Sequence, residues 1–564
     1  MKIHTRSGAA ILATLLLFCM AATMQAQFTF TTNNGTLTVL KYTGSGGDVV
    51  IPSSTNDLTV TAIGNSAFQS KTAVTSVAIP DSVTSIGTNA FYGCSGLTNA
   101  ALHNRITNIA DYAFCDCGKL TSLTIPDGIT SISFYAFGRC LGLTNLVIGN
   151  SVTNIGDSAF NGCHKLTSVS VPDSVISIGG STFSGCDALT NVTFGNSLTT
   201  IGTSAFLSCT KLTSVVIPSS VTSLGNGAFA SCSYLTSATI YGGFGSYTFT
   251  ECTGLTNVTI GTNVTRIGDG MFYTCRKLPG VTIPDTVTNV GNSTFQSCDA
   301  LATMTIPNSV TSIGSSAFQS CTNLTNVSLG SSITSIATST FQGCSGLSNL
   351  TVPNSVTTIG GSAFRSCTSL TNISLGGNIT SIGANAFQGC IGLIALTLPD
   401  SLTSIGTSAF YSCSGLTAIT IPKSVTSIGN SAFRYCSSLT GAYFEGNAPS
   451  ADTTVFTGDN NATVYYLPGT LGWGSTFGGV PTAPWPLPYP VVLNKDPSFG
   501  LHTNGFGFTI CWGTNIPVVV EACTDLANPT WSPVGTNTLT NGLSYFSDPQ
   551  WTNYPASFYR VRSP

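Results

Sequence analysis

The cysteines of this chain have reactive side chains and recur at a regular spacing. The sequence contains 20 cysteines, and 16 of them stand three residues after a phenylalanine that recurs along the chain. These 16 are Cys94, Cys117, Cys140, Cys163, Cys186, Cys209, Cys232, Cys252, Cys275, Cys298, Cys321, Cys344, Cys367, Cys390, Cys413 and Cys436. Regularly spaced thiols could bind a metal, form disulfides or fill a hydrophobic core.

The spacing favours packing over the other two roles. A metal site needs ligands that converge on one centre, commonly from paired C-x-x-C motifs, but Cys115 and Cys117 stand close together without a second pair. Disulfides suit an exported protein, yet equivalent Cβ atoms in stacked copies stay about 4.8 Å apart, beyond the roughly 3.5–4.5 Å of a relaxed bridge. We therefore expect a column of buried thiols. Lys71 and Asp459 take its place in the first and last copies.

Cys511 and Cys523 lie outside this column and suggest a different role. They flank the turn GTNIP in the stretch FGFTICWGTNIPVVVEACTDL, which has the pattern of a β-hairpin. Symmetry about Pro517 would place the two residues opposite each other, within reach of a disulfide. The sequence therefore predicts a bridge between Cys511 and Cys523.

The other residues that could do chemistry are scattered. The four histidines are His4, His103, His164 and His502, and their spacing does not join them with acids in a metal centre. Aspartates that follow a repeated proline supply one carboxylate per copy, whereas Ca²⁺ sites gather several oxygens; these are Asp81, Asp127, Asp173, Asp285 and Asp400. The sequence has no nucleophile motif and no phosphate-binding loop between a strand and a helix. We expect no enzyme activity, metal or cofactor.

The elements that position these residues belong to an internal repeat. Phenylalanine recurs from Phe68 to Phe456 in eighteen copies, and every step is 23 residues except the 20-residue step from Phe229 to Phe249. A typical copy carries an L-x-x-L-x-I run, a Pro or Gly turn, a second short apolar piece and an Ala-Phe pair. Such a copy cannot bury its apolar face alone, so stacked coils with parallel strands are expected. The shortened copy, IYGGFGSYTFTEC, predicts a kink or a tight coil.

The consensus L-T-S-V-x-I-P-x-S-V-T-S-I-G-x-x-A-F-x-x-C resembles the BspA-like (Treponema-type) leucine-rich repeats of bacterial surface proteins. The resemblance covers residues 58–456, and the preceding stretch, 27–57, looks like the entry segment of that family. The resemblance implies a leucine-rich-repeat solenoid with a parallel β-sheet. It also implies an exported protein that adheres or binds through its solenoid surface, and it supplies no catalytic residues.

Both ends of the chain differ from the repeat. Residues 1–26 have the basic start, apolar core and small residue before a cleavage point that are typical of a secretion signal, and no later segment is apolar enough to span a membrane. Residues 457–490 are expected to form a cap and Pro-rich linker, with Tyr465, Tyr466, Trp473 and Trp485 as cap core or, alternatively, as a sugar-binding patch. Residues 491–564 predict a small β-sandwich-like module.

The composition of the chain favours a function in binding a protein or a glycan. Only 7% of the 564 residues are charged and the net charge is −3, so the chain lacks the basic field that nucleic-acid binding needs. The outward strand positions are uncharged and polar; the candidate binding face is Asn145, Thr193, Thr239, Thr259, Thr282, Thr305, Thr351, Thr397 and Thr420. The leading hypothesis is a secreted or cell-surface, non-enzymatic protein that binds a protein or glycan. The alternatives are a carbohydrate- or ice-binding module and a structural envelope spacer.

Overall fold

The structure is a computed structural model that describes residues 27–487, 489–493, 497–503, 505–513, 515–527, 529–553 and 557–564. The predicted secretion signal, residues 1–26, lies outside the described residues. The chain forms two compact units that divide between Ser332 and Ile333, inside the repeat array. The domain boundaries predicted at residues 57, 456 and 490 differ from this division and stay predictions.

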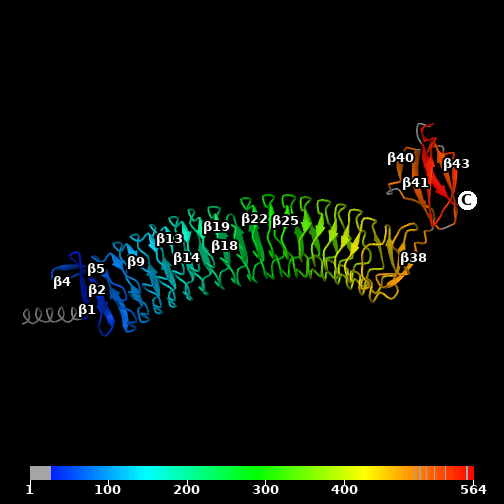
Figure 1. The fold of residues 1–564 in the computed structure, drawn as a ribbon. Coiled ribbons are helices and arrows are strands. Elements are labelled where there is room, and N and C mark those ends of the chain that lie inside the picture. The colour runs from blue at the N-terminus through cyan, green and yellow to red at the C-terminus, as the bar shows by residue number, and fades with distance from the viewer. Residues whose placement is uncertain are drawn as a thin grey trace, which may run out of the picture. The chain divides into compact units, whose positions relative to one another are not determined.

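Most copies of the repeat form one coil with two short strands, and the stacked coils are seen in Figure 1. In one copy, β10 (Ser122–Thr124) is the first strand and β11 (Ser131–Ile132) is the second. Pro126 ends the first strand, because it fixes φ and has no N–H for the sheet, and its carbonyl accepts the Ile129 N–H at 3.1 Å. Phe137 lies in a tight, non-helical turn that leads to the next coil. The predicted solenoid coil is confirmed.

Equivalent strands of neighbouring coils pair in parallel in the first unit. For example, β10 pairs with β12 so that Ser122 lies opposite Asn145 and Leu123 opposite Leu146. The first strands are β3 (Gly47–Val50), β6 (Val74–Ala78), β8 (Asn99–Ala100), β10, β12 (Asn145–Val147), β14 (Ser168–Ser170), β16 (Asn191–Thr193), β18 (Ser214–Ile217), β20 (Ser237–Ile240), β21 (Asn257–Ile260), β24 (Thr303–Thr305) and β26 (Asn326–Ser328). The second strands are β2 (Thr36–Tyr42), β5 (Leu58–Ile63), β7 (Ser85–Ile86), β9 (Asn108–Ile109), β11, β13 (Asn154–Ile155), β15 (Ser177–Ile178), β17 (Thr200–Ile201), β19 (Ser223–Leu224), β22 (Arg266–Ile267), β23 (Asn289–Val290) and β25 (Ser312–Ile313). β1 (Phe28–Asn33) and β4 (Ser54–Thr55) add antiparallel partners to β2 and β5 at the entry.

The second unit continues the same coils and ends in an antiparallel module. Its first strands are β28 (Asn349–Thr351), β30 (Asn372–Ser374), β33 (Ala418–Ile421), β35 (Gly441–Phe444), β36 (Thr463–Tyr466) and β38 (Val480–Pro484), with β37 (Thr476–Phe477) antiparallel to β38. Its second strands are β27 (Ser335–Ile336), β29 (Thr358–Ile359), β31 (Ser381–Ile382), β32 (Ser404–Ile405) and β34 (Ser427–Ile428). The module contains β39 (Val491–Val492), β40 (Gly500–His502), β41 (Gly505–Cys511), β42 (Pro517–Cys523), β43 (Ser532–Thr538), β44 (Leu543–Asp548), a 3₁₀ turn (Trp551–Asn553) and β45 (Phe558–Arg562).

The shortened copy keeps the first sheet and loses a strand from the second. β20 pairs with β21 in register, so that Thr239 lies opposite Thr259 despite the 20-residue step. The segment after β20 forms a bend around Gly243, whose φ of 76° suits glycine. The sheet of second strands accordingly stops at β19, and a new one begins at β22. The missing three residues therefore make a tight coil, as the sequence predicted.

The interior of the coils contains a column of phenylalanine rings and a column of thiols, beside buried Leu, Ile and Val residues such as Leu120 and Ile129. The column rings are fully buried, and neighbouring rings stack with centroids between 4.8 Å, for Phe68 and Phe91, and 5.9 Å, for Phe249 and Phe272. Each thiol fills the corner beside the rings and donates a hydrogen bond to a Phe carbonyl of the previous coil, for example Cys140 to Phe114 at 3.3 Å. Burial of the column is confirmed, and the thiols also link the coils.

Aromatic rings cover the last coils of the repeat. Tyr466 stacks on Trp473 with centroids 5.3 Å apart, and Trp473 meets Phe444 at 5.0 Å. On the other side of the strand, Tyr465 stacks on Tyr443 at 5.0 Å. These contacts shield the apolar end of the array, which is what a solenoid cap must do.

The C-terminal module has the predicted antiparallel sheets but not the predicted hairpin. β41 pairs with β39, β40 and β44, whereas β42 pairs with β43 and β45, so the two strands belong to different sheets. Their inward residues, including Phe508 and Val520, share one core between the sheets. The chain therefore passes from one sheet to the other between β41 and β42. Cys511 lies opposite Leu543 and Cys523 opposite Phe558, both as thiols, so the predicted bridge between them is wrong.

The burial of the thiol column predicts that thiol reagents label the native protein slowly. All 19 cysteines of the described residues are buried thiols, and burial raises the pKa of Cys94 to about 11 and of Cys390 to about 12. Because the thiolate is the reactive species, a thiol reagent at pH 8 should label the native protein only slowly and label all of them in denaturant. The variant Thr193→Cys, on the exposed strand face, should react at once; prompt labelling of several native thiols would contradict the buried column.

The buried carboxyl group of Asp459 predicts that the stability of the protein depends on pH. It replaces the column cysteine in the last coil, is 1% exposed, and neither carboxylate oxygen has a hydrogen-bond partner among the described residues. Burial raises the pKa of Asp459 from its ordinary 3.8 to about 7. The Asp459 carboxylate ionises at a lower pH in the unfolded chain than in the native protein. The free energy of unfolding should therefore fall as pH rises from about 4 to 7 and then level off.

Asp459→Cys restores the residue of the other coils and should remove that pH dependence. Urea unfolding should find the variant more stable than the parent at pH 8, on the order of 2–4 kcal/mol, and similar to it at pH 4. An equal gain at both pH values would show that the carboxylate's charge is not the cause.

Candidate functional site

The predicted strand face is exposed in both units. Eight of its nine residues are exposed and Thr239 is half-exposed. Within the first unit, Thr193 donates a hydrogen bond to Ser170 Oγ at 3.2 Å. Within the second, Thr397 lies opposite Thr420. Thr282 lies in a segment without strand pairing. The face therefore consists of short runs of hydroxyl groups in neighbouring coils.

Apolar side chains interrupt these runs in the first unit. Val147 lies opposite Thr124 and Val216 opposite Thr239, and the two valines are 48% and 54% exposed. A regular lattice such as ice would need an unbroken array of equivalent hydroxyl groups. The interruptions argue against ice binding by this face and leave it suited to ligands that contact a few coils.

Two threonine ladders that the sequence interpretation did not single out reinforce the coils. At the start of the first strand, Thr144 Oγ1 donates to the Thr121 carbonyl at 3.0 Å. Before the second strand, Thr153 Oγ1 donates to the Thr130 carbonyl at 3.0 Å. The same bonds recur along both units, for example from Thr403 to Thr380. The signal was a threonine at two fixed places in each copy, and the exposed hydroxyl groups are thereby held in one orientation.

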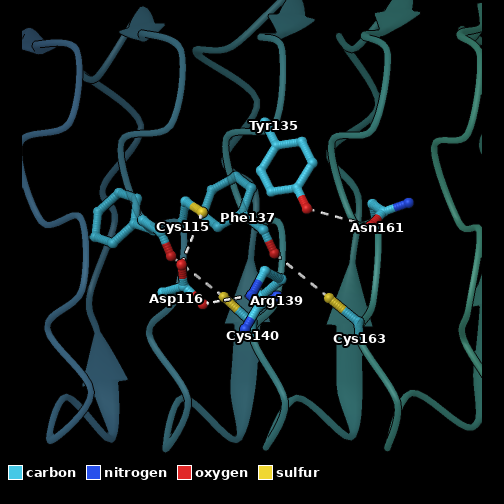
Figure 2. A network of polar contacts seen from close by, with 9 residues as sticks. Cys115, Asp116, Tyr135, Phe137, Arg139, Cys140, Asn161 and Cys163 are labelled. Atoms are coloured by element: carbon cyan, nitrogen blue, oxygen red, sulfur yellow. Dashed lines mark hydrogen bonds and ion pairs between the residues drawn. The ribbon is translucent and has the colours of Figure 1, made fainter.

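A group of aromatic and charged side chains interrupts the repeat at one edge of the first unit. This edge cluster consists of Tyr112, Asp116, Phe134, Tyr135 and Arg139, part of which Figure 2 shows. The Tyr112 ring lies 5.2 Å from Phe134 and 5.4 Å from Tyr135 between centroids, and Phe134 is 40% exposed. Most equivalent residues of the other coils are small or acidic, such as Asp157 and Ser158, although Tyr247 takes the position of Tyr135 in the shortened copy. The rings therefore meet at the surface rather than in the core.

The backbone holds the edge cluster in an unfavourable conformation. Tyr112 and Tyr135 have φ of 57° and 52°, and Asp116 and Arg139 both have φ of 58°. Most other coils place Ser, Asn or Gly at these positions, because left-handed φ costs bulky residues roughly 1 kcal/mol or more. Gly138 makes room for the cluster, since a Cβ there would lie 2.2 Å from the Tyr135 ring.

Polar contacts orient the edge cluster. Arg139 Nε donates to Asp116 Oδ1 at 2.7 Å, and Tyr135 OH donates to Asn161 Oδ1 at 3.3 Å (Figure 2). The Arg139 side chain is 58% exposed, so this ion pair contributes little to stability. Its effect is to hold the guanidinium group against the Asp116 carboxylate of the preceding coil.

Cys115 lies next to the edge cluster but is not a nucleophile. Its thiol is buried and donates to Asp116 Oδ2 at 3.6 Å. Burial, reinforced by the Asp116 carboxylate, raises the pKa of Cys115 to about 12, so the reactive thiolate is suppressed.

The histidines and aspartates that could do chemistry have structural contacts. The rings of His103 and His502 hydrogen-bond backbone carbonyls, and His164 Nδ1 lies 2.8 Å from Asp187 Oδ2. Asp127 and Asp173 accept backbone N–H groups of the next coil, at 2.8 and 2.7 Å. Within the described part of the chain, no group of three or more His, Cys, Asp or Glu residues is arranged to hold a metal.

Among the residues that the structure describes, no helix has the length and apolar character needed to cross a bilayer. This agrees with coils that are built from strands and turns.

Comparison with solved structures finds other leucine-rich-repeat proteins. A leucine-rich repeat protein from Bacteroides ovatus is 26% identical with a TM-score of 0.50, and the match covers 78% of this chain and 98% of that one. A leucine rich cell surface protein from Faecalibacterium prausnitzii is 29% identical with a TM-score of 0.36, covering 70% and 92%. A leucine rich repeat protein from T. pallidum is 25% identical with a TM-score of 0.26, covering 41% and 88%. No curated protein matches the chain.

Comparison with protein families identifies the repeat itself. Residues 48–167, 153–244, 242–371 and 334–463 each match the family described as BspA type leucine rich repeat region, six copies. The four segments overlap and together cover most of the chain. They coincide with the stacked coils of Phe, Cys and Thr columns described above. The chain therefore belongs to the BspA type leucine-rich-repeat family.

Proposed function

We propose that this chain is an exported, non-enzymatic binding protein that attaches to a partner protein through the surface of its solenoid. The edge cluster of Tyr112, Asp116, Phe134, Tyr135 and Arg139 carries the proposal. Exposed aromatic and arginine side chains are the residue types that dominate the energy of protein interfaces. The cluster lies on neighbouring coils of the first unit, which matches the size of an interface centre.

The cost of the edge cluster supports a role in binding. Its rings are not needed to close the coil, because Ser158 and Ser181 occupy the position of Tyr135 in coils with the same turn. Tyr112, Tyr135 and Arg139 hold bulky side chains in left-handed conformations, which reduces stability, and the exposed Arg139–Asp116 pair restores little of that loss. A feature that weakens the fold and gathers exposed aromatic surface is best explained by a partner.

The strand face and the predicted export fit the same function. The face offers uncharged hydroxyl and amide groups in fixed orientations, and we propose it as a second contact surface within each unit. Residues 1–26 have the pattern of a secretion signal, which would place the protein outside the cell or on its surface. The thiols, histidines and aspartates are used in coil-to-coil contacts, which supports binding rather than catalysis.

Array binding with repeat-like variants tests this proposal. Tyr112→Ser, Phe134→Asp and Tyr135→Ser introduce residues that other coils carry at the same positions, so the triple variant should fold. The parent protein should bind members of an array of extracellular-matrix and cell-envelope proteins, and the triple variant should lose about a hundredfold or more in affinity for them.

Tyr234→Ser is the matched control, because Tyr234 is also an exposed aromatic, 68% exposed, outside the edge cluster. It should leave the array binding unchanged, and the triple variant should keep the parent's thermal stability or exceed it. If the parent binds no array member, or the triple variant binds as tightly as the parent, the proposal is wrong.

A further inference from the structure

A polar groove crosses neighbouring coils of the second unit. Its volume is about 860 Å³, and it lies where the first strands end and their turns begin. Its polar lining comes from Asn372, Ser374, Thr397, Asp400, Thr420 and Glu445. These residues belong to four successive coils, so the groove runs along the stack rather than along one strand. A volume of this size accommodates a ligand of several rings.

Two local departures from the repeat open the groove. Gly377 occupies the position that carries Asn354, Asp400 or Lys423 in neighbouring coils, and a Cβ there would meet only Asn354 Oδ1, at 3.8 Å. The coil around Thr397 forms a single bridge to Thr420 instead of a full strand. One end of the groove therefore lacks a side chain, and the backbone of its second coil is less fully paired than the strands beside it.

The lining groups define the chemistry of a ligand. Ser374, Thr397 and Thr420 present hydroxyl groups, Asn372 an amide, and Asp400 and Glu445 carboxylates. The apolar lining residues Ile373, Leu396 and Leu398 are buried, whereas Leu375 and Pro399 are half-buried, so only a small part of the lining is apolar and accessible. None of the described lining residues is cationic. The groove thus favours a ligand rich in hydroxyl groups. Its two carboxylates outnumber the single charge of Lys423, which lies near Glu445, so the net negative charge disfavours an anion.

An aromatic wall stands one strand beyond the groove. Tyr443 lies opposite Thr420 in the parallel register, and its ring stacks on Tyr465 at 5.0 Å and lies 4.9 Å from Trp485. Gly441 leaves space for the ring, because a Cβ there would come within 2.8 Å of it. All three rings are partly exposed. An aromatic surface next to hydroxyl, amide and carboxylate groups can contact the C–H faces of a sugar while its hydroxyl groups are hydrogen-bonded.

We propose that this groove binds an uncharged glycan that extends along successive coils toward Tyr443. Neighbouring coils repeat at about 4.8 Å, close to the length of one pyranose unit in an extended chain, so each coil can offer its hydroxyl group to a different sugar. The proposal goes beyond protein binding by the edge cluster and does not depend on it, because the groove uses residues of the second unit alone.

Titration with soluble polysaccharides tests the proposal on the full chain. Glucan, mannan and galactan serve as neutral probes, and alginate and polygalacturonate as anionic probes, with binding measured by calorimetry and affinity electrophoresis. At least one neutral polysaccharide should bind, and both anionic ones should bind at least about tenfold more weakly.

The double variant Thr397→Val with Thr420→Val removes two hydroxyl groups and keeps the β-branched shape. It should weaken binding of the neutral probe by about tenfold or more, since each lost hydrogen bond contributes roughly 1 kcal/mol, and Tyr443→Ala should weaken it similarly. The matched control, Thr193→Val with Thr259→Val, changes the same column in the first unit and should bind like the parent.

The outcomes separate this proposal from protein binding. Absence of binding to all three neutral probes, equal binding of anionic probes, or an unchanged affinity in the groove variant would overturn it. An equal loss in the control variant would also overturn it, since the face rather than the groove would then bind. The edge-cluster variant should keep its glycan affinity, and the groove variant should keep its protein-array binding.

Discussion

The constraint on which the rest of each unit depends is the parallel pairing of equivalent residues in successive coils. Strand pairing fixes neighbouring coils at about 4.8 Å, so each side chain lies on the same residue type of the next coil. Only groups that stack well on themselves can fill the interior, which explains the ring column from Phe137 to Phe160 and beyond, with centroids 5.5 Å apart. Thiol and threonine hydroxyl donors then bind carbonyls of the neighbouring coil. Stability is therefore shared between neighbours, as in other repeat proteins.

The same constraint makes it informative when a surface residue differs from the equivalent residues of the other coils. Every coil has nearly the same backbone, so the residues of other coils show what a position requires for folding alone. Tyr135 occupies a position at which the next coil folds with Ser158, and Gly377 occupies a position at which the preceding coil folds with Asn354. Such changes strain the backbone or leave a hollow at the surface, and they add no packing to the core. Both candidate sites, the edge cluster and the groove, were found as groups of departures that lie together in space.

The fold and its buried columns could be predicted from the sequence because the period repeats one local solution many times. The coil, the burial of Cys140 and the tight short copy follow from spacing and residue size. The Cys511–Cys523 bridge was predicted wrongly, because local symmetry cannot show that two successive strands join different sheets. The ring contacts of Phe134 and the groove beside Gly377 depend on how neighbouring coils meet, which a one-dimensional pattern does not contain.

Replacement of a ring within the stack tests the central claim most directly. Phe206 lies between Phe183 and Phe229, with centroids 5.2 and 5.0 Å away. Phe206→Ala should reduce the free energy of unfolding by about 3–5 kcal/mol, and amide hydrogen exchange should accelerate in the coils of both neighbours. Tyr234→Ala, an exposed control, should change neither. A loss below roughly 1 kcal/mol, small for a buried ring, or faster exchange confined to the coil of Phe206, would contradict a core that the coils share.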